Sequence, residues 1–180
     1  IDADRVATIT SPNTNWSGQE TVIFTATDPQ DQFDSDGATF TINSPPVISD
    51  IPNQTISEGS SFSAINLDDF VNDSNHSDAE ISWSITGNTN LSATIDENRI
   101  VTITPNNPDW NGSEALTFTA TDPFGAFDTE VASFTVTGVN DPPVVSGVED
   151  QTVPEGQEFA TIALDNFVSD PDNADNELTW

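Results

Sequence analysis

Cysteine is absent from this chain of 180 residues. No disulfide framework can form, and the redox compartment cannot be read from thiols. A secreted protein without disulfides needs another means of holding its fold together, and a bound metal ion is the natural candidate. The absence of cysteine therefore directs attention to groups that bind cations.

Basic residues are nearly absent as well. Two Lys and Arg residues stand against 31 Asp and Glu residues, which gives a formal net charge of -29. Nucleic acids and anionic membrane surfaces both need a basic protein face, so this charge disfavours them as partners. An acidic surface of the halophile type, carboxylates that bind divalent cations, and disorder are compatible with it. The regular strand pattern described below argues against disorder.

Long apolar runs and catalytic motifs are also missing. The sequence contains no signal peptide and no apolar run of transmembrane length, which predicts no membrane insertion. The one His is near no Ser motif, no nucleophile has an adjacent base, and no glycine loop could bind phosphate. Paired carboxylates are abundant enough for a glycosidase pair, but they gather at repeat junctions. We therefore expect a protein that is not an enzyme.

What the chain does contain is an internal repeat, marked by two proline pairs. Pro45-Pro46 and Pro142-Pro143 have a fixed φ and force extended geometry on the residue before them. Each pair ends one run of strand-like sequence and starts another. The predicted segments are the back half of one unit (1–44), a complete unit (45–141) and the front half of a third (142–180). Because the chain begins inside a unit, we expect it to be a piece of something longer.

The repeat can be followed residue by residue. The only two basic residues, Arg5 and Arg99, occupy the same repeat position, and we expect each to pair with a nearby carboxylate such as Asp2 or Asp96. We therefore predict the same fold for all three segments. The matching segments are 1–10 and 95–104, 15–18 and 109–112, 24–29 and 118–123, 57–59 and 154–156, 69–73 and 166–170, and the single residues Trp83 and Trp180.

Within the complete unit the local pattern is that of strands. Short runs alternate apolar with polar or small residues and are bounded by Asn, Asp, Gly and Pro, which indicates half-buried antiparallel strands. About seven strands per unit fit an all-β, two-sheet sandwich of immunoglobulin type. We expect Trp83 and Trp180 to be core tryptophans, and residues 68–71 to form a helical turn that places Phe70 and Val71 in the core. The predicted strands are 47–48, 54–56, 61–67, 81–85, 100–104, 116–121 and 134–137.

The unit resembles the cadherin-like repeats of large bacterial surface adhesins. Glu58-Gly59 is similar to the glutamate motif of the family's first strand, Asp170-Pro171-Asp172 to its D-x-D motif and Thr119-Ala120-Thr121-Asp122 to its A-x-D motif. Val139-Asn140-Asp141 is similar to the interdomain linker, and Asp109-Trp110-Asn111 lies where the family has D-x-E. The resemblance implies tandem Greek-key sandwiches with Ca²⁺ held at their junctions. The many oxygen ligands at repeat-equivalent turns agree with it, because Ca²⁺ takes about 6–8 oxygens.

Transferred residue by residue, the resemblance implies two calcium sites of unequal strength. Its ligands at the second junction are Glu58, Asp109, Asn111, Asn140, Asp141, Asp170 and Asp172. At the first junction only Asp73 and Asp122 are carboxylates, while Asn43 and Asn75 supply neutral oxygens. Fewer charges weaken calcium binding, so we expect the second junction to bind calcium more tightly and to be stiffer.

Transition metals are not expected, because the chain has no Cys and one His. That residue, His76, lies in a polar, Asn-rich loop and is expected to be exposed to solvent. The chain is therefore predicted to be a calcium-rigidified stalk of a surface adhesin or fibre. It would be extracellular or on the cell surface, with its cell-surface or polysaccharide ligand outside this fragment. The alternative is a carbohydrate-binding module that uses calcium and the loop tryptophans Trp16 and Trp110.

The two half units suggest a partner. A sandwich divided in this way has an open apolar face and open edges, which favour strand pairing with another chain. We therefore expect other copies of the same repeat as partners. Residues 142–180 of one chain would complete residues 1–44 of the next, head to tail.

Overall fold

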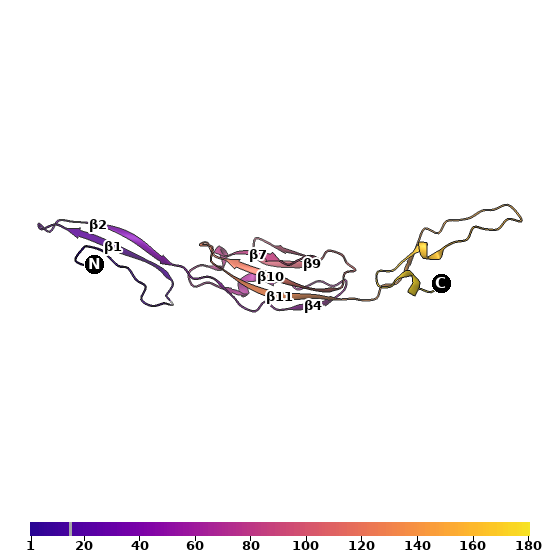
Figure 1. The fold of residues 1–180 in the computed structure, drawn as a ribbon, viewed down its shortest axis with the longest axis horizontal. Coiled ribbons are helices and arrows are strands. Elements are labelled where there is room, and N and C mark those ends of the chain that lie inside the picture. Colours follow the sequence, from indigo (N-terminus) through magenta and orange to yellow (C-terminus); the bar gives the residue numbers. More distant parts are fainter. Residues whose placement is uncertain (15) are drawn as a thin grey trace.

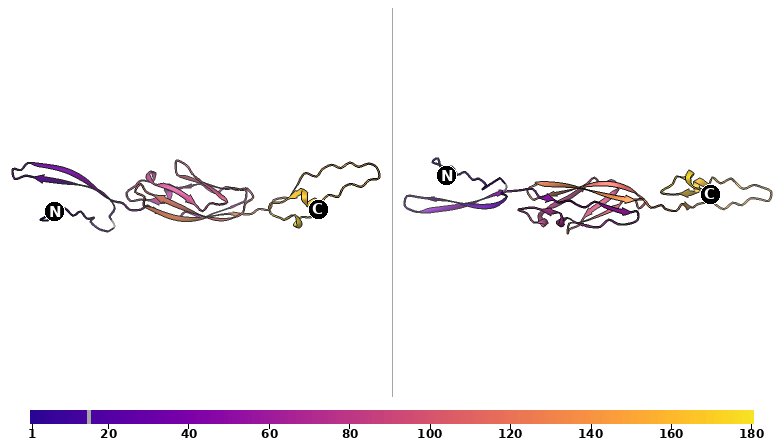
Figure 2. Two further views of the ribbon diagram at one scale, coloured as in Figure 1. Left: turned by 45° about the horizontal axis from the view of Figure 1, so that its top comes forward. Right: turned by 90° about the horizontal axis from the view of Figure 1, so that it is seen from below.

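The computed structural model describes residues 1–14 and 16–180 and is elongated (Figure 1). A compact sandwich lies in the middle, with a long hairpin on its N-terminal side and an open loop region on its C-terminal side, and Figure 2 shows the same order in two further views. The described residues form strands and short 3₁₀ helices but no α-helix. No helix among them has the length and apolar character needed to cross a membrane. The chain is all-β, as the sequence predicts.

The elements follow the repeat. The N-terminal hairpin consists of β1 (Gly18–Thr27) and β2 (Phe33–Ile42). The C-terminal region contains β12 (Val144–Val145), η3 (Leu164–Phe167), β13 (Val168–Ser169) and η4 (Asp175–Glu177). The middle unit contains β3 (Val47–Ile48), β4 (Gln54–Ser57), β5 (Ile65–Asn66), η1 (Leu67–Asp69), β6 (Val71–Asn72), η2 (Asp78–Glu80), β7 (Ser82–Thr86), β8 (Leu91–Ile95), β9 (Ile100–Pro105), β10 (Gly112–Thr121) and β11 (Phe127–Thr137).

Two sheets form the sandwich of the middle unit. The first has the strand order β4-β11-β10-β7, and the second has the order β5-β9-β8. Strand β4 runs parallel to β11, and the other neighbours in these sheets are antiparallel. Strands β3 and β6 form a separate antiparallel pair. This is the two-sheet arrangement that the strand pattern predicts.

The core lies between the two sheets because alternate residues of a strand point to the same face. Phe118 and Phe134, on neighbouring strands, are fully buried with ring centroids 6.4 Å apart. Buried aromatic rings contribute most to the energetics of a small core, so this pair is a main part of the packing between the sheets. The other buried residues of the central strands are Leu116 and Ala120 in β10, Ala132 and Val136 in β11, and Val101 and Ile103 in β9.

The strand predicted over residues 61–67 is mostly wrong, because only Ile65–Asn66 pairs with a neighbouring strand. A side chain takes the place of the missing partner. The Ser63 N–H donates to Gln54 Oε1 at 2.8 Å, and Gln54 Nε2 donates to the Ser63 carbonyl at 3.0 Å. The amide of Gln54 thus satisfies the backbone that a strand would otherwise pair. Gln151 and Ala160 make the same contacts in the third segment.

Two further expectations need adjustment. The predicted helical turn over residues 68–71 is a 3₁₀ helix over Leu67–Asp69, and Phe70 and Val71 pack against the core as expected. Strand β8 (Leu91–Ile95) was not predicted. It forms because it pairs along its whole length with β9 and buries Leu91.

The half units expose residues whose repeat equivalents are buried. Phe40 is 37% exposed, whereas its equivalent Phe134 is 0% exposed. In the third segment Phe159 is 64% exposed, whereas its equivalent Phe62 is 8% exposed. The expectation that Trp180 is a core residue is wrong for the same reason: it is 57% exposed, because no facing sheet covers it.

Candidate metal sites at the unit junctions

The second junction brings three carboxylates together from three separate loops. Glu58 follows β4 in a turn closed by Gly59, whose φ of 73° suits glycine. Asp109 precedes β10, and Asp141 lies in the linker after β11. One carboxylate oxygen from each lies within 4.8 Å of the others. The Val139 N–H donates to Glu58 Oε2 at 2.9 Å, which fixes the linker beside the cluster.

Two more carboxylates approach from the third segment. Asp170 and Asp172 lie in the loop after β13. The Asp170 carboxylate accepts the N–H groups of Asp172 and Asn173 at 2.9 Å each, which sets the shape of that loop. The Asp141 N–H in turn donates to Asp172 Oδ2 at 2.6 Å. The linker is therefore held between carboxylates of both flanking units.

The electrostatics of this cluster are unfavourable without a cation. Burial, followed by four neighbouring carboxylates, raises the pKa of Asp141 above its ordinary value of 3.8. Neither Arg offsets this charge, because Arg99 pairs with Asp68 and Arg5 lies in the first unit. In decreasing order of effect, the neighbours that raise the pKa are Asp172, Glu58, Asp109 and Asp170.

The two predicted amide ligands of this junction are exposed. Asn140 Nδ2 donates to the Asp141 carbonyl at 2.9 Å, so its side chain supports the linker backbone. Asn111 lies against Gly138, where an added Cβ would meet Asn111 Nδ2 at 3.3 Å. Both side chains therefore adjoin the linker.

The first junction is organised differently, by a chain of hydrogen bonds between neutral side chains and one carboxylate. Asn43 Nδ2 donates to Asp122 Oδ2 at 2.6 Å, and Asn75 Nδ2 donates to Asn43 Oδ1 at 2.8 Å. The Ser44 hydroxyl donates to Asn75 Oδ1 at 3.0 Å. The sequence placed Asn43, Asp73, Asn75 and Asp122 at one junction, and here Asn43, Asn75 and Asp122 are in direct contact.

Asp122 lies at the buried end of this series of hydrogen bonds and is 4% exposed. Its Oδ1 accepts the N–H groups of Phe124 at 2.8 Å and Ala126 at 2.9 Å. Burial raises the pKa of this carboxyl, but the hydrogen bonds from Asn43 and the two N–H groups outweigh burial, so its pKa is lowered. Asp122 therefore stays ionised inside the junction.

Serine hydroxyls extend the network towards the first unit. Ser44 Oγ lies 2.6 Å from Ser74 Oγ, and Ser74 Oγ lies 2.7 Å from Ser17 Oγ. Ser17 belongs to the first unit and Ser74 to the second. The neighbouring Asn15, which occupies the repeat position of Asp109, lies outside the described residues. The two units thus contact each other through neutral groups.

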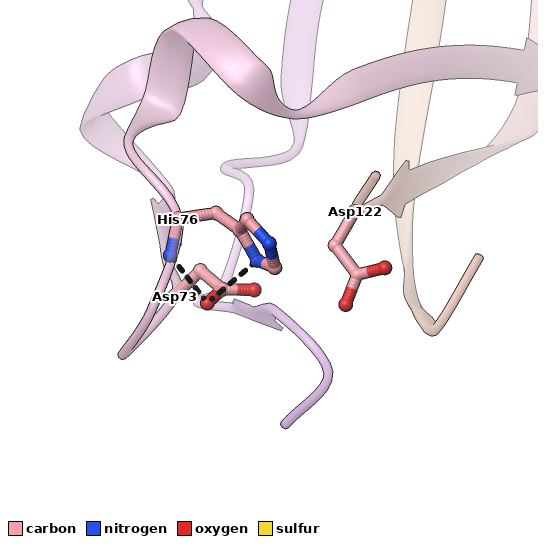
Figure 3. A group of neighbouring side chains, drawn as sticks. All are labelled: Asp73, His76 and Asp122. Atoms are coloured by element: carbon pink, nitrogen blue, oxygen red, sulfur yellow. Dashed lines mark hydrogen bonds and ion pairs between the residues drawn. The ribbon is translucent and has the colours of Figure 1, made fainter. Parts of the chain in front are cut away.

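His76 is the residue that sequence reasoning missed at this junction. The expectation that it is exposed is wrong: its side chain is 7% exposed, and its Nδ1 lies 3.4 Å from Asp73 Oδ1. Figure 3 shows the imidazole ring between the carboxyl groups of Asp73 and Asp122. Ligand atoms of these three residues lie within 4.8 Å of one another. One feature of the sequence could have indicated this burial. His76 lies three residues after Asp73, in a turn that is closed because the Asp73 carboxylate accepts the N–H groups of Asn75 and His76.

Arg99 pairs with a carboxylate as expected, but its partner is Asp68 and not Asp96. Arg99 Nε and Nη2 donate to the two oxygens of Asp68 at 2.5 Å and 2.6 Å. Asp96 Oδ1 instead accepts the N–H groups of Asn98 and Ile100. This leaves Arg99 with a structural role, because it joins η1 to the turn before β9.

Trp110, a residue of the carbohydrate-binding alternative, packs against the core. A Cβ added to Gly112 would lie only 2.7 Å from Trp110 Cζ2, so the ring lies directly on the strand backbone. A ring that is partly buried in this way offers little flat surface for a sugar. This packing argues against Trp110 as a stacking platform.

The donor atoms of the two junctions suit different cations. At the second junction the gathered ligands are carboxylate oxygens, which fit Ca²⁺. At the first junction an imidazole joins two carboxylates. The junctions therefore differ in chemical type as well as in charge.

Comparison with known proteins gives a family match for the middle unit. Residues 43–137 match the model of a family described as a bacterial Ig domain. Among solved structures the chain is similar to the human desmocollin-1 ectodomain, with 14% identity and a TM-score of 0.44 over 71% of this chain and 29% of that chain. A protocadherin gammaB7 EC3-6 cis-dimer structure matches with 17% identity and a TM-score of 0.39 over 72% of this chain and 34% of that chain. The chain thus spans about a third of the length of these structures. No curated protein matches it.

Proposed function

The chain belongs to the family of bacterial Ig domains, and on that premise we propose that it is a repeat region of a surface adhesin or fibre whose second junction is stiffened by calcium. Domains of this family are typical of extracellular or cell-surface proteins and are generally structural rather than enzymatic. The proposed units are 1–44, 45–141 and 142–180. Their role is mechanical: they carry an adhesive part, outside this chain, away from the cell surface.

The convergence of carboxylates at the second junction is the observation behind the calcium proposal. Glu58, Asp109 and Asp141 share one small volume. The third segment adds Asp170 and Asp172, and the five belong to both units and to the linker between them. Like charges at this separation repel strongly unless a cation lies between them. A hard cation with oxygen ligands suits this set.

Calcium would act on the linker by removing that repulsion. Without it, burial and then the neighbouring carboxylates hold the pKa of Asp141 above its ordinary value. With it, ligands from two units attach to the same ion, and the units can no longer rotate freely about the linker. Pro142-Pro143 limits the remaining backbone freedom. The expected result is a stiff joint that loosens when calcium is removed.

Thermal unfolding of the chain in calcium and in EGTA tests this proposal. At a calcium concentration about 100 times the dissociation constant, the bound form should be stabilised by about 2.7 kcal/mol. Asp141→Asn should abolish most of that gain, because it removes the central carboxylate. Asp50→Asn removes the same charge from an exposed position outside the junction and should leave the gain intact. A melting temperature that calcium does not change would contradict the proposal.

Other copies of the repeat are the proposed partners. The N-terminal hairpin exposes Phe40 and Ile42 at 37% and 40%, and the C-terminal segment exposes Phe159 and Ile162 at 64% and 41%. All four are repeat equivalents of buried core residues: Phe134, Val136, Phe62 and Ile65. Each segment therefore presents the face that the other one is suited to cover. We propose that residues 142–180 of one chain cover residues 1–44 of the next.

A further inference from the structure

We propose that the first junction is a site for a divalent transition-metal ion such as Zn²⁺, held by Asp73, His76 and Asp122. This site is separate from the proposed calcium cluster and does not depend on it. It lies at the opposite end of the middle unit, in the loops before β7 and after β10. Its three ligand atoms lie within 4.8 Å of one another.

A buried oxygen without a partner points to a ligand at this place. The Asp73 side chain is 0% exposed. Its Oδ1 accepts the N–H groups of Asn75 at 2.8 Å and His76 at 3.0 Å, while its Oδ2 is buried and makes no hydrogen bond. Figure 3 shows this second oxygen turned towards Asp122. A buried carboxylate oxygen without a partner costs folding free energy, and a metal ion would satisfy it.

The surroundings of the other two ligands support the same assignment. Metal-bound carboxylates and imidazoles are usually held by further hydrogen bonds. Asp122 Oδ2 accepts from Asn43 Nδ2, and a carboxylate oxygen has lone pairs for both an amide and an ion. The Nδ1 of His76 lies 3.4 Å from Asp73 Oδ1 and 3.3 Å from Asn75 Nδ2, so neighbouring polar groups hold the ring in place beside Asp73. The His76 ring is supported by Phe124, with ring centroids 5.5 Å apart.

The donor set selects the class of metal. Imidazole nitrogen suits Zn²⁺ and neighbouring transition ions, whereas Ca²⁺ prefers oxygen alone. Two carboxylates and one imidazole form a set that Zn²⁺ accepts, with a position left for water. At the second junction the residue equivalent to His76 is Asn173, which has no imidazole. The two junctions would therefore take different ions from the same medium.

The single histidine makes the test direct. In the whole chain, with calcium present at saturation, the imidazole signals of His76 are followed by two-dimensional ¹H–¹⁵N NMR while ZnCl₂ is added. Stoichiometric zinc should shift or broaden these signals. Calorimetry then measures zinc affinity in the variants, and we expect His76→Asn and Asp73→Asn each to lower it by at least about tenfold.

Matched controls separate this site from the acidic surface. His76→Asn should fold, because Asn173 occupies the equivalent position with the same N–H contact to Asp170. Asp50→Asn removes a carboxylate from an exposed position outside both junctions and should leave the zinc response of His76 unchanged. When calcium is added without zinc to a sample that contained neither ion, the His76 signals should not shift at concentrations where zinc shifts them.

Three results would overturn the proposal. The first is an unchanged His76 spectrum at millimolar zinc. The second is equal zinc affinity in the parent chain and in His76→Asn. The third is a calcium response of His76 as strong as its zinc response, since this would indicate an ordinary oxygen site. None of these outcomes bears on calcium at the second junction, which Asp141→Asn tests separately.

Discussion

At the scale of single residues, Glu114 shows how one carboxylate can hold a loop. Its Oε1 accepts from the N–H and side-chain Nδ2 of Asn90 at 2.6 Å and 2.8 Å, and its Oε2 accepts from the N–H groups of Thr89 and Leu91 at 3.1 Å. Burial raises the pKa of Glu114, but these hydrogen bonds outweigh burial and lower the pKa below its ordinary value of 4.5. Its repeat equivalent Glu20 is exposed, because the loop that it would hold belongs to the other half of a unit.

Replacing Glu114 with Gln should lower the free energy of unfolding of the middle unit by about 1.5–3 kcal/mol near neutral pH, because hydrogen bonds to a charged group are lost. The folded state has the lower pKa, so the unfolded state binds more protons as the pH falls. The contribution of Glu114 is therefore present above its unfolded pKa and disappears as the pH falls through its folded pKa. Urea unfolding at neutral pH and at successively lower pH measures this.

Glu20→Gln is the matched control and should have no effect at any of these pH values. A loss for Glu114→Gln that stays constant down to the most acidic pH would contradict the assignment of its effect to the ionised carboxylate.

At the scale of elements, the start of β10 depends on a local contact between Trp110 and Gly112. Gly112 has a φ of 152°, a region that other residues rarely adopt. The ring of Trp110 lies where a Cβ on Gly112 would point, 2.7 Å from Cζ2. The first unit repeats the arrangement more loosely, with Gly18 at a φ of 137° and Trp16 Cζ2 at 3.5 Å. In both units, the Trp-x-Gly sequence thus lies at the bend where the chain enters the long hairpin strand.

Gly112→Ala should destabilise the middle unit by about 2–4 kcal/mol, because it adds backbone strain and forces the Trp110 ring to move. Denaturant unfolding in metal-free buffer, followed by tryptophan fluorescence, measures the loss. Gly125→Ala is the matched control, since its φ of 87° is also positive but nothing lies within 4 Å of its added Cβ. The control should cost about 1–2 kcal/mol from strain alone. Equal losses in the two variants would show that the Trp110 contact contributes nothing.

At the scale of the whole molecule, two junctions of different chemistry join three bodies in a row (Figure 1). The first junction is closed by amides, hydroxyls and one ionised carboxylate that accepts three hydrogen bonds. At the second junction, burial and then four neighbouring carboxylates raise the pKa of Asp141. Calcium should therefore change the second junction more than the first.

The cysteine-free sequence allows spin labels to measure this difference. Cysteines replace the exposed residues Ser35 and Thr129 to span the first junction, and Thr129 and Glu158 to span the second. Calcium should narrow the distance distribution across the second junction and change the first much less, because five carboxylates gather at the second junction whereas Asp122 at the first already accepts three hydrogen bonds. Equal narrowing across both junctions would contradict the proposed inequality.

The exposed half units should associate head to tail as protein concentration rises. Light scattering after size-exclusion chromatography measures the mass. Phe40→Ser should weaken association, because the equivalent Phe134 is 0% exposed when both sheets are present. Phe33→Ser is the control, because Phe33 is 73% exposed and its equivalent Phe127 stays 62% exposed in the complete unit. A mass that remains that of a single chain, or an equal effect of both variants, would argue against complementation.

The sequence by itself determined the repeat, the all-β class and the faces of the long strands, because alternation and turn residues act over a few neighbouring positions. Phe118 and Phe134 could be placed in the core from that pattern alone. Sequence also brought Asp73 and Asp122 to one junction, through repeat position and family resemblance.

Only the tertiary structure decided which polar groups meet. His76 becomes buried beside Asp73 and Asp122 because the sandwich brings the loop before β7 against the loop after β10. Arg99 reaches Asp68 rather than Asp96, and Gln54 replaces a strand partner at Ser63. Some of these contacts join residues far apart in the chain, and others depend on a side-chain geometry that no local sequence pattern encodes. Their partners exist only once the two sheets have packed together.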